Sequence, residues 1–157
     1  MAVDLKIKSN SKQLASKFKR LQSKLPRIID KGVKQAGFQL VDRIRTKTQK
    51  GIDRNDVRFE PYSEGYLKRL RREGKSTSVD LFYTGRMLGS LGTKKTGKHK
   101  VSLGFNNAEM RQRALFNQVL NEPKREFFGF NKRTENIIQK TFNRFVEKEL
   151  RKFRIWV

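Results

Sequence analysis

The sequence predicts an α+β domain in which long N-terminal and C-terminal helices pack on a small antiparallel sheet. Three observations indicate this class: apolar residues recur at helical spacing near both ends, a strand pattern with a basic turn lies between them, and 157 residues suit one modest core. We expect one structural domain over residues 1–157. It comprises a helical third at 9–51, a mixed part at 52–130 and a C-terminal helix at 131–157.

The N-terminal third combines a short strand pattern with two helical stripes. Residues 3–7 alternate between apolar and charged side chains, which predicts an edge strand. A helix capped by Ser9 or Ser11 follows, with an apolar stripe over residues 14–25. Pro26 suits the first turn of a new helix, so we expect the chain to break there.

The second helical stripe runs from Ile28 to the predicted stop at Gly51. Gly32 and Gly37 lie inside it, where each weakens helicity by about 1 kcal/mol relative to alanine. These glycines predict that another helix or subunit crosses closely.

The mixed part contains two short helices and a hairpin. Residues 63–72 form the first helix, with Tyr66, Leu67 and Leu70 inward. Thr84 is expected to cap the second. Its inward residues are Met87, Leu88 and Leu91, and Leu81 and Phe82 precede it as an apolar anchor. Residues 92–105 predict two strands joined by a basic tip.

The last third predicts two more helices. Asn107 caps the first, on which Met110, Ala114 and Val119 are expected to face the core, and Pro123 ends it. Residues 125–130 contain three phenylalanines, which favour burial on both sides or, as we prefer, a contact with another subunit. The final helix starts near residue 134, and its wide apolar stripe predicts burial on more than one side.

Enzymatic chemistry finds little support in the sequence. There is no cysteine, and His99 lies in a lysine-rich tip without a local carboxylate, so we expect a solvated loop residue. Asp53 and Asp56 form the nearest carboxylate pair, but Arg54 and Arg58 are placed to neutralise them. We therefore expect no catalytic residue, no metal site and no cofactor. No apolar run is long enough to span a bilayer, and the N-terminus lacks an apolar signal core.

The charge predicts acidic partners. Lysine and arginine number 38 against 15 acidic residues, a formal net charge of +23. A basic hairpin tip could line a channel for DNA, bind an acidic protein, or be solvated without a partner. Net charge alone does not favour any of these three interpretations. The tip residues concerned are Lys94, Lys95, Lys98 and Lys100.

Four phrases in fixed order carry a resemblance to a known family. They are FEPYSEGYLKRL, VDLFYTGRMLGSL, KVSLGF and REFFGF, between Phe59 and Phe130. This order resembles the virion morphogenesis and tail-completion proteins of tailed phages over about the last two thirds of the chain. The family often has a His-Gln-apolar-Gly phrase where this chain has residues 117–120, Asn-Gln-Val-Leu. The matching positions are Phe59, Pro61, Ser63, Tyr66, Leu81, Thr84, Gly85, Met87, Ser90, Arg125, Phe127 and Gly129.

The resemblance implies a tail-completion-like fold and a structural role in the virion neck or tail. It predicts a homo-oligomeric ring, with six copies expected, that joins the DNA-filled capsid to the tail. Neighbouring neck, connector and tail proteins would be partners, with sequence-independent contact to genomic DNA, and the chain would reside in host cytoplasm during assembly. The family-like framework comprises Tyr62, Tyr66, Leu81, Thr84, Gly85 and Arg125, and the expected subunit contacts are Phe127 and Phe128.

A free-standing basic nucleic-acid-binding protein is the alternative. The charge, helices and aromatic residues fit it. No helix-turn-helix signature, zinc spacing or aromatic RNA-binding phrase supports it, and FFGF at 127–130 is better interpreted as packing.

Overall fold

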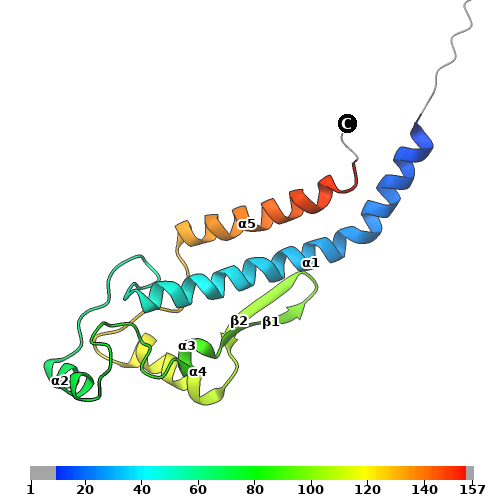
Figure 1. Ribbon diagram of the computed structural model, residues 1–157. Helices are drawn as coiled ribbons and strands as arrows, with labels where there is room; N and C mark the ends of the chain where they lie inside the picture. Colours follow the sequence, from blue (N-terminus) through cyan, green and yellow to red (C-terminus); the bar gives the residue numbers. More distant parts are fainter. Residues whose placement is uncertain (1–9, 155–157) are drawn as a thin grey trace, which may run out of the picture.

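The computed structural model describes residues 10–154 and confirms the α+β class (Figure 1). Two long helices, α1 (Ser11–Gln49) and α5 (Lys132–Arg151), come from the two ends of the chain. Between them lie α2 (Glu64–Arg72), α3 (Arg86–Gly89), strands β1 (Leu91–Gly97) and β2 (Lys100–Phe105), α4 (Ala108–Leu115) and the π-helix η1 (Phe116–Leu120). The strand predicted at residues 3–7, and a cap at Ser9, lie outside the described residues.

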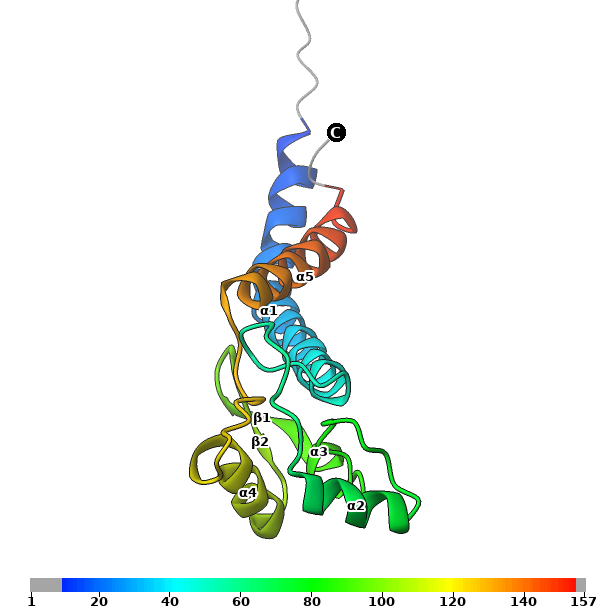
Figure 2. The ribbon, with the colours of Figure 1, turned by 90° about the vertical axis from the view of Figure 1, so that its left-hand side faces the viewer.

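Helix α1 is the central element of the molecule. Figures 1 and 2 show α5 along one side of α1 and the β1–β2 hairpin on the other. A Cβ atom at Gly32 would lie 3.0 Å from the ring of Phe142 on α5, so the predicted crossing helix is present. At Gly37 a Cβ would lie 3.1 Å from Val101, so the neighbour there is a strand of the same chain.

The predicted break at Pro26 is wrong. Pro26 lies inside one continuous helix. A proline in a helix removes one backbone donor and crowds the preceding turn, which bends the helix when flanking residues keep it formed. Figure 1 shows α1 changing direction within its blue part. Residues 11–20, on the N-terminal side of this bend, are all exposed.

The core lies where α1 meets the hairpin, α3 and α4. Leu40, Val41 and Ile44 of α1 form its floor. Arg45 locks the α3–β1 junction onto α1 by donating to the carbonyls of Leu88, Gly89 and Leu91. The other buried residues of the cluster are Met87, Leu88, Leu91, Phe105, Met110, Ala114 and Phe127.

Phe127 is therefore not a subunit contact. Its side chain is 2% exposed and packs edge-on against Phe105 within the same core. Phe128 is half-buried, with its ring centroid 5.6 Å from that of Phe105, so only part of its surface is open to another chain. Of the three phenylalanines, Phe130 is the most exposed, at 56%. The segment is mainly intrachain packing, the reading that we had not preferred.

Two helix starts differ in how well the sequence predicted them. Asn107 caps α4 as expected, because its side-chain oxygen accepts from the backbone nitrogens of Glu109 and Met110. Thr84 does not cap α3. Gly85 occupies that position with φ 71°, in the left-handed region that glycine tolerates best. The expected inward position of Val119 is also wrong, since η1 leaves its side chain 49% exposed.

Helix α5 is covered on one side only. Thr134 is its one buried residue, and the stripe that includes Ile138, Phe142 and Phe145 is half-buried against α1. The predicted burial on more than one side is absent in the described part of the chain. None of the helices among residues 10–154 is long and apolar enough to cross a bilayer.

Candidate functional site

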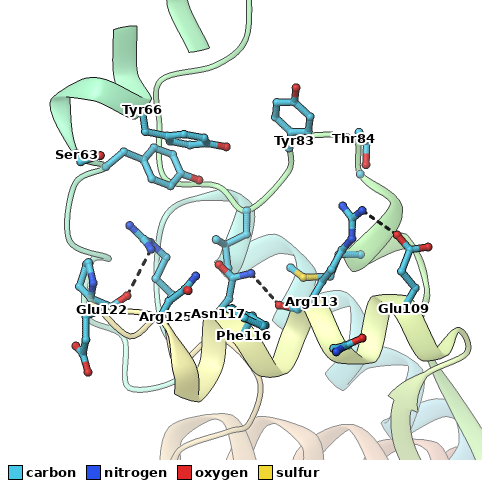
Figure 3. Close-up of a pocket in the computed structure, with 17 residues that line it drawn as sticks. Ser63, Tyr66, Tyr83, Thr84, Glu109, Arg113, Phe116, Asn117, Glu122 and Arg125 are labelled. Carbon is cyan, nitrogen blue, oxygen red and sulfur yellow. Dashed lines mark hydrogen bonds and ion pairs between the residues drawn. The ribbon is translucent and has the colours of Figure 1, made fainter. Parts of the chain in front are cut away.

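All six residues of the predicted framework line one cleft. It lies between the start of α2, the segment before α3, and α4 with η1 and the following loop (Figure 3). Its volume is about 800 Å³. The residues brought together are Tyr62, Tyr66, Leu81, Thr84, Gly85 and Arg125. Segments that are distant in the sequence, from Tyr62 to Arg125, thus form a single surface, which we call the framework cleft.

Arg125 is the most unusual residue of the framework cleft. It is only 6% exposed. Its guanidinium carbon lies 4.9 Å from the centroid of the Tyr62 ring, a cation–π contact. Its Nη1 donates to the carbonyl of Pro123 at 3.4 Å, and its Nε is buried without a hydrogen-bond partner. The guanidinium is thus held by one aromatic face and one distant carbonyl.

Tyr62 and Tyr66 form the aromatic wall of the framework cleft. Their rings meet edge to face at 4.8 Å. Burial raises the pKa of Tyr62, the nearby Asp80 carboxylate raises it further, and the Arg125 charge opposes this rise. Tyr62 therefore stays a neutral phenol at physiological pH.

The opposite wall carries charges that are already paired. Arg113 Nη2 lies 2.8 Å from Glu109 one turn before it on α4. At the rim, Glu122 pairs with Lys124 at 3.7 Å. Asn117 donates to the Arg113 carbonyl, as Figure 3 shows. These walls offer amides and hydroxyls, but no carboxylate there is unpaired.

Gln118 is a positioning residue that the sequence did not reveal. Its Oε1 accepts from the backbone nitrogen of Phe128 at 2.9 Å, and its Nε2 donates to the Phe128 carbonyl at 3.0 Å. The backbone nitrogen of Arg125 donates to the Asn117 carbonyl at 2.7 Å. The phrase at 117–120, where this chain departs from the family pattern, thus anchors the segment that carries Arg125.

A second surface is strongly cationic. A cleft of about 520 Å³ lies between α1 and the end of α5, and its one carboxylate, Glu149, is paired with Lys152. Lys17 donates to the Arg154 carbonyl across it at 3.0 Å. We call this surface the α1–α5 cationic cleft. Its basic residues are Lys17, Arg20, Lys24, Arg27, Lys31, Lys152 and Arg154.

The cationic surface continues toward the hairpin. A groove of about 340 Å³ shares Arg27 and Lys31 with the α1–α5 cationic cleft and adds Lys34, Lys95 and Lys100. Two of the four predicted tip lysines therefore face the same groove as α1. The other two, Lys94 and Lys98, are exposed residues that do not line it.

The hairpin tip is fixed, which corrects the expectation for His99. Asp30 of α1 accepts from the His99 backbone nitrogen at 3.0 Å and contacts His99 Nδ1 at 2.8 Å. Its other oxygen accepts from Lys95 Nζ at 2.5 Å. The hydrogen bond from Lys95 is the main cause that lowers the pKa of Asp30 to about 2, and the His99 bonds add to it. His99 is thus a structural anchor and Lys95 is partly neutralised.

The carboxylate pair at Asp53 and Asp56 serves local structure. Asp53 accepts from the backbone nitrogens of Asn55 and Val57, which closes a turn. Asp56 pairs with Lys47 at 2.8 Å and accepts from Asn131 at 2.7 Å, and these two contacts lower its pKa. Lys47, not the predicted arginines, neutralises it. No cluster of three or more metal-ligating side chains occurs within residues 10–154.

Comparison with known proteins adds no identity to this geometry. No family model, curated protein or solved structure matches the chain significantly. The functional argument therefore depends on the two clefts and on the surface that the fold leaves open.

Proposed function

We propose that this protein is a structural subunit of a phage neck or tail, which assembles with copies of itself into a ring and helps to join the DNA-filled capsid to the tail. The proposal combines the order of the four sequence phrases with the surface properties of the fold. In this role the described residues hold partners in place, and the chain performs no chemistry. Six copies and virion residence are part of the proposal.

The observation that carries the proposal is the excess of exposed surface. The chain exposes 12126 Å², whereas a compact monomer of 18.5 kDa exposes about 8,200 Å². The excess is about 3,900 Å², and the twelve residues outside 10–154 account for at most about 2,000 Å² even as extended chain. The remainder, about 1,900 Å², is close to what one chain loses in two standard interfaces of about 800 Å² per partner, which is the number of contacts that each subunit of a ring makes.

Part of this open surface is apolar. Four neighbouring residues at the end of α4 and in η1 are each about half exposed, and we call them the η1 patch. Exposed large apolar side chains that lie close together are typical of a protein contact. The members of the η1 patch are Leu115, Phe116, Val119 and Leu120, with exposures of 50%, 50%, 49% and 57%.

A free-standing nucleic-acid-binding protein is the second candidate, and the cationic stripe on α1 favours it. Basic residues recur there at steps of three and four, from Lys17 to Lys34. This stripe follows about 25 Å of helix, comparable to seven base pairs of duplex. Such a stripe would contact phosphates without reading bases. The same surface would also suit DNA passing through a ring, so the two candidates differ in assembly and not in charge.

Measurement of mass in solution separates the candidates. A six-membered ring has a mass of about 111 kDa, six times 18.5 kDa, and light scattering after size exclusion resolves it from the monomer. The double variant Val119→Ser/Leu120→Ser should shift the mass toward monomer, whereas Val57→Ser, which removes an exposed apolar residue elsewhere, should not. In the native source, the chain should sediment with viral particles. A monomer at all concentrations that is absent from particles would contradict the proposal.

A further inference from the structure

Arg125 is a buried cation without a counter-ion among residues 10–154. The carboxylates nearest to it in sequence are already paired with other residues. Glu126 pairs with Arg54 at 2.6 Å and Glu122 with Lys124 at 3.7 Å. Asp80, close enough to affect Tyr62, accepts from the backbone nitrogen of Phe82 at 2.9 Å and makes no ion pair with Arg125.

A charge in this state is costly unless something compensates it. Removing a guanidinium from water without an ion pair or full hydrogen bonding opposes folding. The Tyr62 ring and the Pro123 carbonyl at 3.4 Å are neutral, and Nε has no acceptor at all. A buried donor without a partner in a folded chain needs an explanation, and an external acceptor is one.

The surroundings of Arg125 favour an extended polypeptide as the source of that acceptor. The framework cleft of about 800 Å³ has a wall of tyrosine rings, and hydroxyls and amides of Thr84, Asn117 and Asn121 line it. Rings pack against side chains, while hydroxyls and amides bind backbone groups. A second copy of this chain is a poor source, because acidic residues number only 15 against 38 basic ones.

We propose that the framework cleft binds an acidic segment of a different protein, whose carboxylate forms an ion pair with Arg125. This inference rests on the proposed function, since it identifies the chemistry of one neighbour in the assembly. The carboxylate would balance the charge of the guanidinium, and the Tyr62 ring would shield the ion pair from water. Charge-assisted bonds of this kind fix orientation as well as strength.

The test uses the intact chain and an acetylated, amidated tetraglutamate peptide as the probe. At about 0.3 M NaCl, which screens the exposed cations, the parent should bind this peptide and show a shifted Arg125 Nε–H signal by NMR. Tetraglutamine should leave the signal in place. Inorganic phosphate that shifts it equally would overturn the acidic-segment assignment.

Two variants separate binding from folding. Arg125→Met should melt at or above the temperature of the parent, because it removes an uncompensated charge, yet bind tetraglutamate at least about tenfold more weakly. Arg111→Gln, which removes an exposed charge on α4 outside the cleft, should bind like the parent. Unchanged affinity of Arg125→Met, or its failure to fold, would refute the inference. A ring that assembles normally while tetraglutamate fails to bind would refute this site and leave the proposed function standing.

Discussion

Asp30 connects two parts of the chain that are far apart in sequence. Its two carboxylate oxygens bind Lys95 and His99, which holds the hairpin tip on α1. An ionised aspartate with this many donors is stabilised in the folded state, and its pKa falls to about 2 from 3.8. The tip is therefore sensitive to acid although it is rich in lysine.

Replacing Asp30 by Asn should lower the stability at neutral pH and flatten its dependence on acid. Because the folded-state pKa is below the ordinary value, ionised Asp30 stabilises the fold fully above pH 3.8, and this contribution is lost as the pH falls toward about 2. Urea unfolding midpoints across this range measure the effect. Asp42→Asn, on an exposed position of the same helix, is the control. Parallel curves for the parent and Asp30→Asn would contradict the prediction.

Alanine substitutions at the adjacent residues Thr84 and Gly85 should affect stability very differently. Gly85→Ala should destabilise the fold by at least about 1–2 kcal/mol, because φ is 71° and the new Cβ would lie 2.7 Å from the Phe82 ring. Thr84→Ala should change the free energy of unfolding by less than about 0.5 kcal/mol, since Thr84 is exposed and makes no capping bond. Chemical denaturation of both variants tests this. A larger loss of unfolding free energy for Thr84→Ala than for Gly85→Ala would indicate that Thr84 caps α3 after all.

At the scale of elements, the contact between α1 and α5 depends on the absence of a side chain at Gly32. Alanine there would gain about 1 kcal/mol of helix propensity. However, its Cβ would meet the Phe142 ring at 3.0 Å and the Phe145 ring at 3.1 Å. The steric cost of this close contact between the two helices thus offsets the gain in helix propensity.

The steric cost at Gly32 can be measured by comparing two glycine-to-alanine substitutions. Gly65→Ala in α2, with no atom within 4 Å of its new Cβ, should raise the free energy of unfolding by up to about 1 kcal/mol. Gly32→Ala should give less than this, or destabilise, because α5 must move outward. Thermal or urea unfolding of the two variants provides the comparison. Equal stabilisation by both would show that the Phe142 ring adapts without cost.

Local sequence patterns predicted most elements but not their partners. The hairpin, the Asn107 cap and the C-terminal helix follow from alternation, a capping residue and periodicity, all of which act over a few residues. The continuity of α1 through Pro26 was not predicted, because a proline suits the first turn of a helix, whereas here it lies inside one. The anchoring of His99 escaped because Asp30 lies 69 positions away.

The candidate sites were predictable to different degrees. The resemblance selected six residues that share one cleft, although nothing in their spacing indicated a buried, unpaired Arg125. The α1–α5 cationic cleft was not predicted. The signal was present, since Lys17, Arg20, Lys24, Arg27 and Lys31 recur at steps of three and four. The sequence pattern could not show that the end of α5 packs opposite this stripe and forms the second side of the cleft.

At the scale of the whole molecule, a stripe of cations runs along one face of α1 from Lys17 to Lys34. The two acids that face them, Asp30 and Glu149, are both paired, so they do not neutralise the surface further. When such a surface binds a polyanion, counterions are released. The slope of log affinity against log salt concentration is therefore proportional to the number of phosphates contacted.

Replacing Lys17, Arg20 and Lys24 by Gln should reduce the slope of log affinity against log salt by about three for duplex DNA, at about 0.9 per lost contact. The reason is that each residue faces the α1–α5 cationic cleft. Lys68, Arg71 and Arg72 to Gln, on α2, form the control with equal charge change. Fluorescence anisotropy over a salt series measures both slopes. Equal reductions in the two triple variants would show that net charge, and not this surface, binds DNA.

The exposed first turns of α1 have a consequence for thermodynamics. Residues 11–20 are all exposed and add no buried side chain to the core, and a short helix alone is marginal in water. If neighbouring copies cover this segment, part of its folding free energy comes from association and obeys mass action. Dilution alone would then lower the melting temperature, and a tenfold change in protein concentration would act on stability like a mutation.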